Sequence, residues 1–457
     1  MKKNDIIELD ITGMTSEGSG VGRAEGMAVF VPLAAVGDRV TAHILKVKKT
    51  YAYAKIDEIL TPSADRVEPD CPVFAQCGGC VYRHINYEAE LKIKQDYVES
   101  CFQRIAGLPL RLNPIVGALQ TVGCRNKAQL PVREENGEIK IGFFARHSHR
   151  VVNSTACRLQ PEAFRRVTEA VRGWIVENRV SVYDETTHTG LLRHIFMRAS
   201  KDCKELVLCL VINGTALPHA DSLIERCAPL GVTGLALNVN RERTNVILGE
   251  TCQTLWGKPA ITDTLCGKSF DISPLSFYQV NRDQAERLYA KAAEYAGCDE
   301  NAVLLDLYCG VGTIGLTMAG KVKQLIGVEI VPQAVEDAAR NAEKNGVTNA
   351  RFLCGDAAEA ARQLELEHIR PTAVILDPPR KGCDEALIQT VANMQPQRIV
   401  YVSCDPATLA RDYARFVALG YVCPEENGRH CVTPFDLFPR TQHCEVVCKL
   451  LRSDINS

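Results

Sequence analysis

The chain has 457 residues and a formal net charge of −2, with 46% hydrophobic and 24% charged residues. This length predicts several domains of roughly 100–200 residues each, and the composition excludes a disordered or fibrous chain. No stretch approaches the roughly 18 consecutive apolar residues of a membrane span. The opening MKKNDIIELD lacks the apolar core of a secretory signal, so we expect a cytoplasmic protein whose 20 cysteines are reduced.

The first 60 residues predict a small β-barrel. Four short strands, IIELDIT, MAVFVPL, RVTAHILKV and YAYAKIDEIL, are separated by the glycine-rich EGSGVGRAEG and by AVGD. Because the net charge is slightly negative, any surface for nucleic acid must be local. The two basic runs are 46–55, where Lys46, Lys48, Lys49 and Lys55 are interleaved with tyrosines, and 146–150; a solvated charged face is the alternative for each.

Three cysteines follow in CPVFAQCGGC, namely Cys71, Cys77 and Cys80. The intervening glycines allow the loop to fold around a metal centre, although a Cys₄ site needs a fourth thiolate. Zinc and an iron–sulfur cluster suit thiolates equally, and cysteines without a metal are the third alternative. A helix is then expected from about Glu88 to Arg104.

The rest of the chain changes character near residue 273. From about 113 to 270 strands are mixed with a helical stretch, which indicates an α+β unit. After Ser273 strands and helices alternate, which predicts a doubly wound, mostly parallel sheet whose ligands bind at the carboxyl ends of its strands.

A cofactor site is expected where the strand LLDLYC runs into Gly310 and Gly312. Glycines let backbone approach a ligand, and Glu329 ends the next strand at the spacing of a ribose-binding acid. A nicotinamide enzyme shares this layout. Asp356 and Asp377 end the third and fourth strands, and this order resembles class I S-adenosylmethionine methyltransferases. Helix capping is the alternative role for either aspartate alone.

Cys404 is the candidate nucleophile. It lies in VYVSCDPATLARD, after an apolar strand and before a helix with Asp405 as the expected N-cap and Pro406 at the first position. A helix N-terminus favours a thiolate, so we expect a lowered thiol pKa. An inert buried thiol is the alternative. Glu445, in QHCEVVCKL, is the candidate general base, unless it is a solvent-facing strand residue.

These motifs together resemble the bacterial 23S rRNA (uracil-5-)-methyltransferases of the RumA type over nearly the whole length. GSGVGR, VFVP and GD are similar to a TRAM domain, an OB-like RNA-binding barrel. SFYQVN, at 276–281, is similar to the segment that contacts S-adenosylmethionine, and its Phe277 either stacks on a base or belongs to the core. Cys404 in SCDP and Glu445 in HCE match the nucleophile and the base.

The resemblance implies a multi-domain α/β protein of three parts. These are a TRAM barrel (1–62), a central α+β domain with an iron–sulfur site (63–82 and 115–270), and a Rossmann-like class I methyltransferase domain (83–114 and 271–457). It implies a [4Fe-4S] cluster of structural or RNA-positioning role, held by Cys71, Cys77, Cys80 and Cys157. The implied cofactor contacts are Gln279, Tyr308, Gly310, Gly312, Thr313, Glu329, Asp356 and Asp377.

The implied reaction is methylation of carbon 5 of a uracil, which needs covalent help because that carbon is a poor nucleophile. The favoured substrate is 23S ribosomal RNA, since the tRNA relatives typically lack the barrel and the cysteine cluster. We expect no membrane association and no obligate protein partner. Two alternatives stand: a tRNA uracil-5-methyltransferase, and a non-catalytic RNA-binding protein whose catalytic half is degenerate. Cytosine enzymes carry their nucleophile in a different context.

Overall fold

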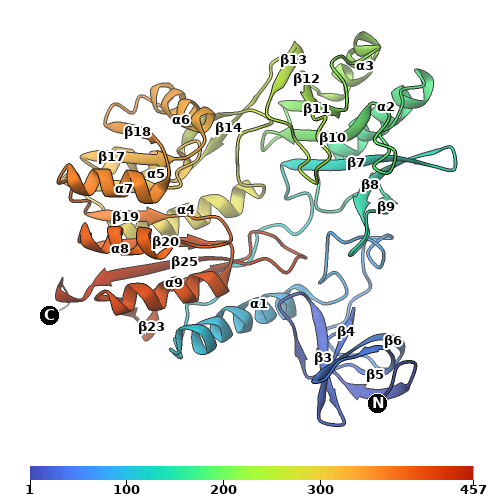
Figure 1. Cartoon of the computed structure of the whole chain (residues 1–457), viewed down its shortest axis with the longest axis horizontal. Helices are drawn as coiled ribbons and strands as arrows, with labels where there is room; N and C mark the ends of the chain where they lie inside the picture. The colour runs from blue at the N-terminus through green and yellow to red at the C-terminus, as the bar shows by residue number, and fades with distance from the viewer. Residues whose placement is uncertain (456–457) are drawn as a thin grey trace.

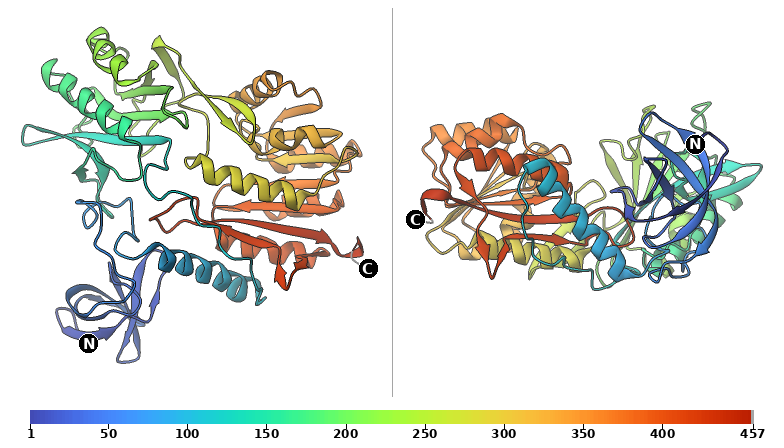
Figure 2. Two further views of the ribbon diagram at one scale, coloured as in Figure 1. Left: turned by 180° about the vertical axis from the view of Figure 1, so that it is seen from behind. Right: turned by 90° about the horizontal axis from the view of Figure 1, so that it is seen from below.

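The computed structural model describes residues 1–455 and contains three larger sheets, which follow one another along the chain. Figure 1 shows the N-terminal sheet, the central sheet and the C-terminal sheet as three separate bodies, with one long helix running from the first to the third. Figure 2 shows the same arrangement from behind and from below. In the part of the chain described, no helix is both long and apolar enough to cross a membrane.

The N-terminal body is a six-stranded sheet that curls until β1 and β3 touch. Its apolar interior is formed by alternate residues such as Val29, Val31, Val40 and Ala42, all fully buried. The strands run in the order β1-β5-β6-β4-β3-β2 and comprise β1 (Ile6–Asp10), β2 (Gly13–Met14), β3 (Ser19–Ala24), β4 (Met27–Pro32), β5 (Arg39–Val47) and β6 (Tyr51–Thr61).

Strand β3 corrects the sequence prediction, which placed a break in this glycine-rich stretch. A Cβ on Gly22 would lie 2.4 Å from Leu9 Cγ, and one on Gly20 would lie 2.8 Å from Ala34 Cβ. The glycines are therefore needed because the curled sheet brings other residues against this strand, not because the chain turns there.

The central body is a seven-stranded sheet in the order β13-β12-β11-β10-β7-β8-β9, antiparallel except for the β11–β12 pair. Helices α2 and α3 supply apolar residues to its main core, among them Trp174 and Leu223. The elements are β7 (Lys127–Glu135), β8 (Glu138–Phe144), β9 (Val151–Asn153), α2 (Glu162–Glu177), β10 (Leu192–Ala199), β11 (Leu206–Ile212), α3 (Ala220–Cys227), β12 (Gly234–Val239) and β13 (Cys252–Gly257).

The C-terminal body has the alternation predicted after residue 273. Strands β16 to β20 are parallel, in the order β18-β17-β16-β19-β20, and β25 continues the sheet antiparallel to β20. Its strands are β16 (Val303–Leu307), β17 (Gln324–Glu329), β18 (Ala350–Cys354), β19 (Ala373–Leu376), β20 (Arg398–Ser403), β21 (Tyr421–Val422), β24 (Val432–Phe435) and β25 (Glu445–Arg452); a separate short pair is β22 (Glu425–Glu426) and β23 (Arg429–His430).

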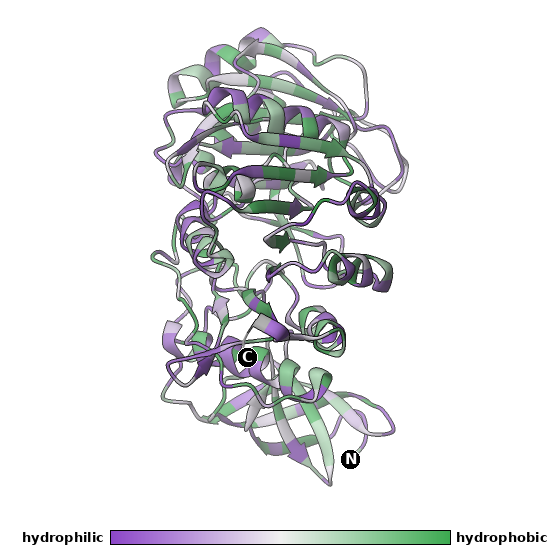
Figure 3. Ribbon diagram, turned by 90° about the vertical axis from the view of Figure 1, so that its left-hand side faces the viewer, coloured by the Kyte–Doolittle hydropathy of each residue, from purple (hydrophilic) through white to green (hydrophobic). Residues whose placement is uncertain are grey.

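Both faces of this sheet are covered, so its central strands are largely apolar, as the green colour in Figure 3 shows. Leu305 packs with one group of helices and Leu304 with the other. The first group is α1 (Tyr87–Cys101), α7 (Ala357–Leu366), α8 (Glu385–Asn393) and α9 (Pro406–Ala418). The second face carries α4 (Arg282–Ala296), α5 (Thr313–Met318), α6 (Pro332–Lys344) and the hairpin β14 (Ile261–Leu265) and β15 (Lys268–Ile272).

The helix expected at 88–104 is present as α1, continued by a π-helical turn over Phe102–Ala106. Although it precedes the central sheet in sequence, Val98 and Phe102 are fully buried in the C-terminal core, and the Phe102 ring meets Tyr413 of α9 edge-on at 5.3 Å. Helix α1 therefore packs with the C-terminal body. The residues at and before its N-terminal end, 81–90, lie close to the chain that leads into β25.

Candidate active site

The predicted cofactor and catalytic residues meet because their strands end at one edge of the C-terminal sheet. Leu307 of β16 pairs with Leu376 of β19, and Leu376 pairs with Tyr401 of β20. Tyr308 and Asp377 follow directly on their strands, and Cys404 lies three residues beyond Tyr401. The carboxyl ends of parallel strands are where such folds bind ligands.

The turn after β16 has the close backbone that the glycines predicted. Gly312 has a φ of 82°, a left-handed conformation that favours glycine, and a Cβ there would lie 2.9 Å from Leu316 Cδ1. Gly310 has a φ of 56° and open space where a Cβ would point. Tyr308 takes a left-handed φ of 66° although it is not a glycine, a strained conformation typical of functional turns.

Two of the predicted cofactor acids make hydrogen bonds within the protein. Glu329 accepts the N–H of Gly310 at 3.1 Å and that of Val331 at 2.9 Å. Asp356 caps α7, accepting the amides of Ala358 and Glu359 on a single oxygen, Oδ1. The capping role that was the alternative for Asp356 is thus observed, and its cofactor role stays a prediction.

Buried acids gather in the crevice. Burial raises the pKa of Asp377 to about 7. It raises the pKa of Asp306 to about 7 as well, although Asp306 Oδ2 accepts the Gly315 amide at 2.8 Å. Sequence reasoning did not select Asp306, which lies inside an apolar strand; a carboxylate at a position facing a core is the signal that could have found it.

Cys404 and Glu445 lie opposite each other at the start of β25. Ser403 of β20 pairs with Val446 of β25, so the next residues outward in this antiparallel pair are Cys404 and Glu445. Glu445 is 3% exposed, which excludes the solvent-facing alternative, while Cys404 is half-buried. Burial, then the nearby Asp377, raises the pKa of Glu445 to about 8.

The lowered pKa expected for the Cys404 thiol is wrong. Burial, followed by the negative charges of Glu445 and Asp377, raises it to about 11. Asp405 is the N-cap of α9 as predicted, and its carboxylate accepts the amides of Ala407 at 2.9 Å and Thr408 at 3.0 Å. The helix amides that would have stabilised a thiolate are therefore occupied by a carboxylate.

Arg380 is the cation that sequence reasoning missed. It lies directly after the Asp-Pro-Pro turn, and its charge lowers the pKa of both Cys404 and Glu445 against the raising effects of burial and the acids. Its guanidinium is 3.4 Å from His443 Nε2. A basic residue that directly follows a turn carrying a predicted site acid is the signal that could have identified it.

The segment 276–281 contacts the chain that leads into β25, because the Asn281 side-chain amide donates to Leu437 O at 3.1 Å. Gln279 and Thr313 are both 8% exposed, and Thr313 Oγ1 lies 3.2 Å from the Tyr289 hydroxyl. Phe277 is 65% exposed, so it is not a core residue. Its stacking on a base stays a prediction.

The four predicted cluster cysteines come from two distant parts of the chain and lie near one another. A negative charge on Cys80 would raise the pKa of Cys77 and Cys157, and one on Cys71 would raise that of Cys77 and Cys80. All four are half-buried. Nevertheless, within residues 1–455 no group of three or more His, Cys, Asp or Glu side chains forms a metal-binding arrangement.

The loop that carries Cys71, Cys77 and Cys80 is held by hydrogen bonds that involve its backbone. Gly79 N–H donates to Cys77 Sγ at 3.3 Å, Gly78 N–H donates to Phe144 O at 3.0 Å, and the Arg146 guanidinium donates to Cys80 O at 2.6 Å. Arg146 is thereby used inside the protein, which leaves the 146–150 run a weaker candidate for binding RNA than the 46–55 run.

Comparison with known proteins is consistent with this geometry. The family described as tRNA (uracil-5-)-methyltransferase matches residues 268–453, and the TRAM domain family matches residues 2–56. An RNA methyltransferase of Halalkalibacterium halodurans is 42% identical over 453 residues, 98% of each chain. One from Clostridium tetani is 40% identical over 449 residues, 98% of this chain and 96% of the other.

A solved structure is also similar over nearly the whole length. It is the Pyrococcus abyssi tRNA (uracil-54, C5)-methyltransferase in complex with S-adenosyl-L-homocysteine, which is 28% identical. The TM-score is 0.77, with 97% of this chain and 100% of that chain covered.

Replacing the buried acid Glu445 by glutamine is expected to stabilise the protein more at pH 8 than at pH 5. The folded pKa of about 8 exceeds the usual 4.5, so the folded state binds more protons between these values and stability falls as pH rises through that window. Glu445→Gln removes this loss, so we expect its stability relative to wild type to rise by about 3 kcal/mol between pH 5 and pH 8, or roughly 6–12 °C in the unfolding midpoint.

The unfolding midpoint is measured by thermal melts at both pH values. The proteins compared are the wild type, Glu445→Gln and the exposed Glu336→Gln. The Glu336 variant should follow the wild type. A Glu445→Gln protein whose stability relative to the wild type does not rise between pH 5 and pH 8 would contradict the raised pKa.

Proposed function

Because the chain belongs to the S-adenosylmethionine-dependent RNA (uracil-5-)-methyltransferases, with a TRAM domain at its N-terminus, we propose that it methylates carbon 5 of a uridine in 23S ribosomal RNA with Cys404 as nucleophile and Glu445 as base. The observation that carries the mechanism is the register of β20 and β25, which sets a thiol and a buried carboxyl opposite each other at the ligand-binding edge.

The proposed reaction uses these two groups in order. The Cys404 thiolate adds to carbon 6 of uracil, and the displaced electron pair makes carbon 5 nucleophilic. S-adenosylmethionine, when bound, would supply the methyl group to carbon 5, and its sulfur would keep the electron pair of the broken bond. The Glu445 carboxylate removes the proton from carbon 5, the carbon 5–carbon 6 double bond re-forms, and the sulfur of Cys404 leaves as a thiolate.

Both groups hold their protons too tightly in the free protein for this role at neutral pH, with pKa values of about 11 and about 8. A positive charge in the crevice would lower both. Arg380 supplies one such positive charge. S-adenosylmethionine, when bound, would supply the methyl group and, through its sulfonium, a second positive charge. We therefore propose that Cys404 ionises in the loaded enzyme, with its proton passing to a neighbouring carboxylate or to solvent.

We propose that the cofactor lies along the turn after β16. Gly310 leaves open space beside the backbone, Gly312 has a left-handed φ, and Tyr308 and Asp377 directly follow the paired strands β16 and β19 at the same edge. The full proposed set is Gln279, Tyr308, Gly310, Gly312, Thr313, Glu329, Asp356 and Asp377, within a domain formed by 83–114 and 271–457.

RNA contact by the barrel (1–62) is supported by the end of its β5–β6 hairpin. The four lysines of the 46–55 run are exposed there, beside an aromatic group in which Phe30, Tyr51 and Tyr53 have ring centroids 5.5–5.8 Å apart. Lysines neutralise phosphates, and the 43% exposed Tyr53 offers a face for stacking.

A tRNA uridine is the second candidate substrate. The Pyrococcus abyssi enzyme acts on tRNA by its name, and the alignment covers 97% of this chain, so it spans the barrel as well as the catalytic half. The presence of a barrel therefore does not by itself favour ribosomal RNA. Either substrate places the reaction in the cytoplasm.

We also propose a [4Fe-4S] cluster on Cys71, Cys77, Cys80 and Cys157, within a central domain of 63–82 and 115–270. Four thiols from two chain segments within electrostatic reach of one another, on a loop whose Gly79 amide already donates to sulfur, suit such a group. Its proposed role is to fix the loop, and no step of methyl transfer passes through it.

Loss of the Cys404 sulfur should abolish covalent capture of RNA. Cys404→Ala is expected to give no methyl transfer and no denaturant-resistant adduct with RNA containing 5-fluorouridine, whose fluorine cannot leave as a proton, while RNA binding remains. Cys298→Ala, a half-buried thiol at the opposite end of β16, is the control and should form the adduct. Methylation by Cys404→Ala, or no adduct with wild type, would defeat the mechanism.

The substrate is tested by mapping 5-methyluridine in total RNA from a deletion strain and its complemented control. We expect one or more 5-methyluridines of 23S ribosomal RNA to disappear, while tRNA keeps its own. Loss from tRNA alone would replace the ribosomal proposal by the second candidate.

The cluster is tested on protein purified without oxygen. We expect iron and sulfide in [4Fe-4S] proportion with broad visible absorption, lost in Cys157→Ser and kept in Cys203→Ser, a half-buried thiol elsewhere in the central sheet's core. A colourless wild-type protein with stoichiometric zinc would count against it.

A further inference from the structure

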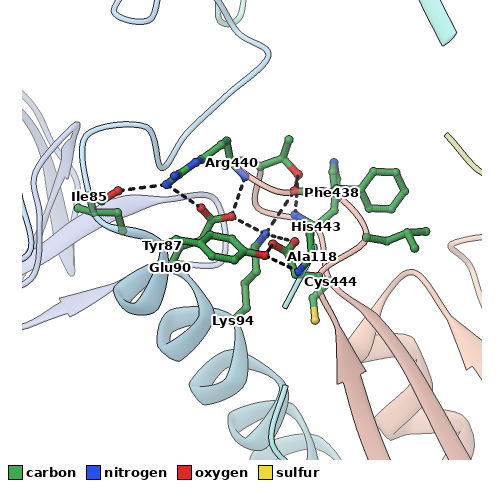
Figure 4. Close-up of polar contacts among 12 residues, drawn as sticks. Ile85, Tyr87, Glu90, Lys94, Ala118, Phe438, Arg440, His443 and Cys444 are labelled. Atoms are coloured by element: carbon green, nitrogen blue, oxygen red, sulfur yellow. Dashed lines mark hydrogen bonds and ion pairs between the residues drawn. The ribbon is translucent and has the colours of Figure 1, made fainter. Parts of the chain in front are cut away.

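We infer that Lys94, Glu90, Tyr87 and Asp436 are positioning residues for the catalytic base. With Arg440 they form a buried network that fixes the segment 436–444, which leads directly into Glu445 (Figure 4). The inference rests on the proposed role of Glu445, and it assigns a function to helix α1, which contributes none of the predicted catalytic or cofactor residues.

Lys94 is the centre of the network. Its side chain is 1% exposed, and its ammonium donates to Glu90 Oε1 at 2.8 Å, to Asp436 Oδ1 at 2.7 Å and to Phe438 O at 3.3 Å. An ammonium has three donors, so all are used. Two of the three acceptors belong to the segment 436–444.

Glu90, one helical turn before Lys94 on α1, binds the same segment. Its Oε1 accepts the Arg440 backbone N–H at 2.7 Å, and its Oε2 lies 3.4 Å from the Arg440 guanidinium. That guanidinium also donates to Ile85 O at 3.2 Å and lies 5.4 Å from the centre of the Tyr87 ring. These contacts hold Arg440 in a left-handed backbone conformation, with a φ of 68°.

Asp436 completes the set from the start of the segment. Its Oδ2 accepts the Tyr87 hydroxyl at 2.6 Å, and that hydroxyl in turn accepts the Ala118 amide at 2.7 Å. The side chains of Glu90 and Asp436 are both fully buried, and two cations balance two carboxylates.

A short series of hydrogen bonds links the position of the segment 436–444 to the position of Glu445. Thr441 Oγ1 donates to Phe438 O at 2.8 Å and accepts the His443 N–H at 3.3 Å. His443 is the residue that meets Arg380, and Cys444 and Glu445 follow it into β25. Fixing residues 436, 438 and 440 therefore fixes where β25 begins and how Glu445 faces Cys404.

Apolar residues of similar volume can fill such a space with equal or better stability, because burying charges is costly. Apolar packing, however, does not set the direction of a turn as a saturated set of charged hydrogen bonds does. The placement of three buried charges and the partly buried Arg440 at the base of this segment therefore favours a role in positioning over a role in stability alone.

Glu90→Gln tests the inference, with Glu162→Gln as the matched control on the exposed face of α2. A glutamine keeps one acceptor oxygen, so its NH2 group would face either Lys94 or the Arg440 guanidinium, each of which needs an acceptor. We expect proton removal from carbon 5 to slow by about 100-fold, as for a misplacement of about 1 Å, with KM for RNA and cofactor unchanged. With ordinary RNA the Cys404 adduct should then accumulate, because methylation precedes proton removal.

The control and wild type should show no such adduct on ordinary RNA, and Glu445→Gln should show it most strongly. Tyr87→Phe, which removes one hydroxyl and keeps all four charges, should show it weakly, and it carries the test if Glu90→Gln does not fold. Folded network variants with normal turnover, or with slow turnover and no adduct, would overturn the inference. If Glu445→Gln itself accumulates no adduct, the proposed base is wrong instead.

Discussion

The proposed reaction centre depends on one topological constraint, the antiparallel direction of β25 beside β20. In an all-parallel sheet the strand beside β20 would begin at the opposite edge, far from Cys404. Because β25 runs the other way, its first residue, Glu445, lies at the carboxyl end of β20, where Ser403 pairs with Val446. The cofactor turn, the thiol and the carboxyl thus share one edge without any of them lying on a long loop.

This arrangement places several buried acidic side chains close together. Asp306, Asp377 and Glu445 all have raised pKa values because burial disfavours their charged forms, and Cys404 is raised further by two of them. Arg380 offsets part of this charge. The acids, only partly offset by Arg380, make this edge of the sheet an environment that favours a further cation, which agrees with a cofactor that carries a sulfonium group.

Local chemistry explains which features the sequence predicted. The Gly310–Gly312 turn, the Asp405 cap and the alternating strands depend on neighbouring residues, and they were predicted correctly. Strand β3 was missed because Gly20 and Gly22 are required by residues elsewhere in the chain. The thiol pKa was wrong because the residue next to Cys404 already binds the helix amides. The ion pair of Lys94 with Asp436 spans 342 positions, and no local pattern indicates it.

Arg440 connects the parts that the proposed function needs to act together. Its carbonyl accepts the Val81 N–H at 2.8 Å and the Tyr82 N–H at 3.2 Å, directly after Cys80, while its amide and guanidinium bind α1. The cysteine loop and the segment before Glu445 are therefore joined by backbone bonds at one residue. A cluster that holds this loop would stabilise the catalytic geometry without electron transfer, because a displaced Val81 would pull on the backbone five residues before the base.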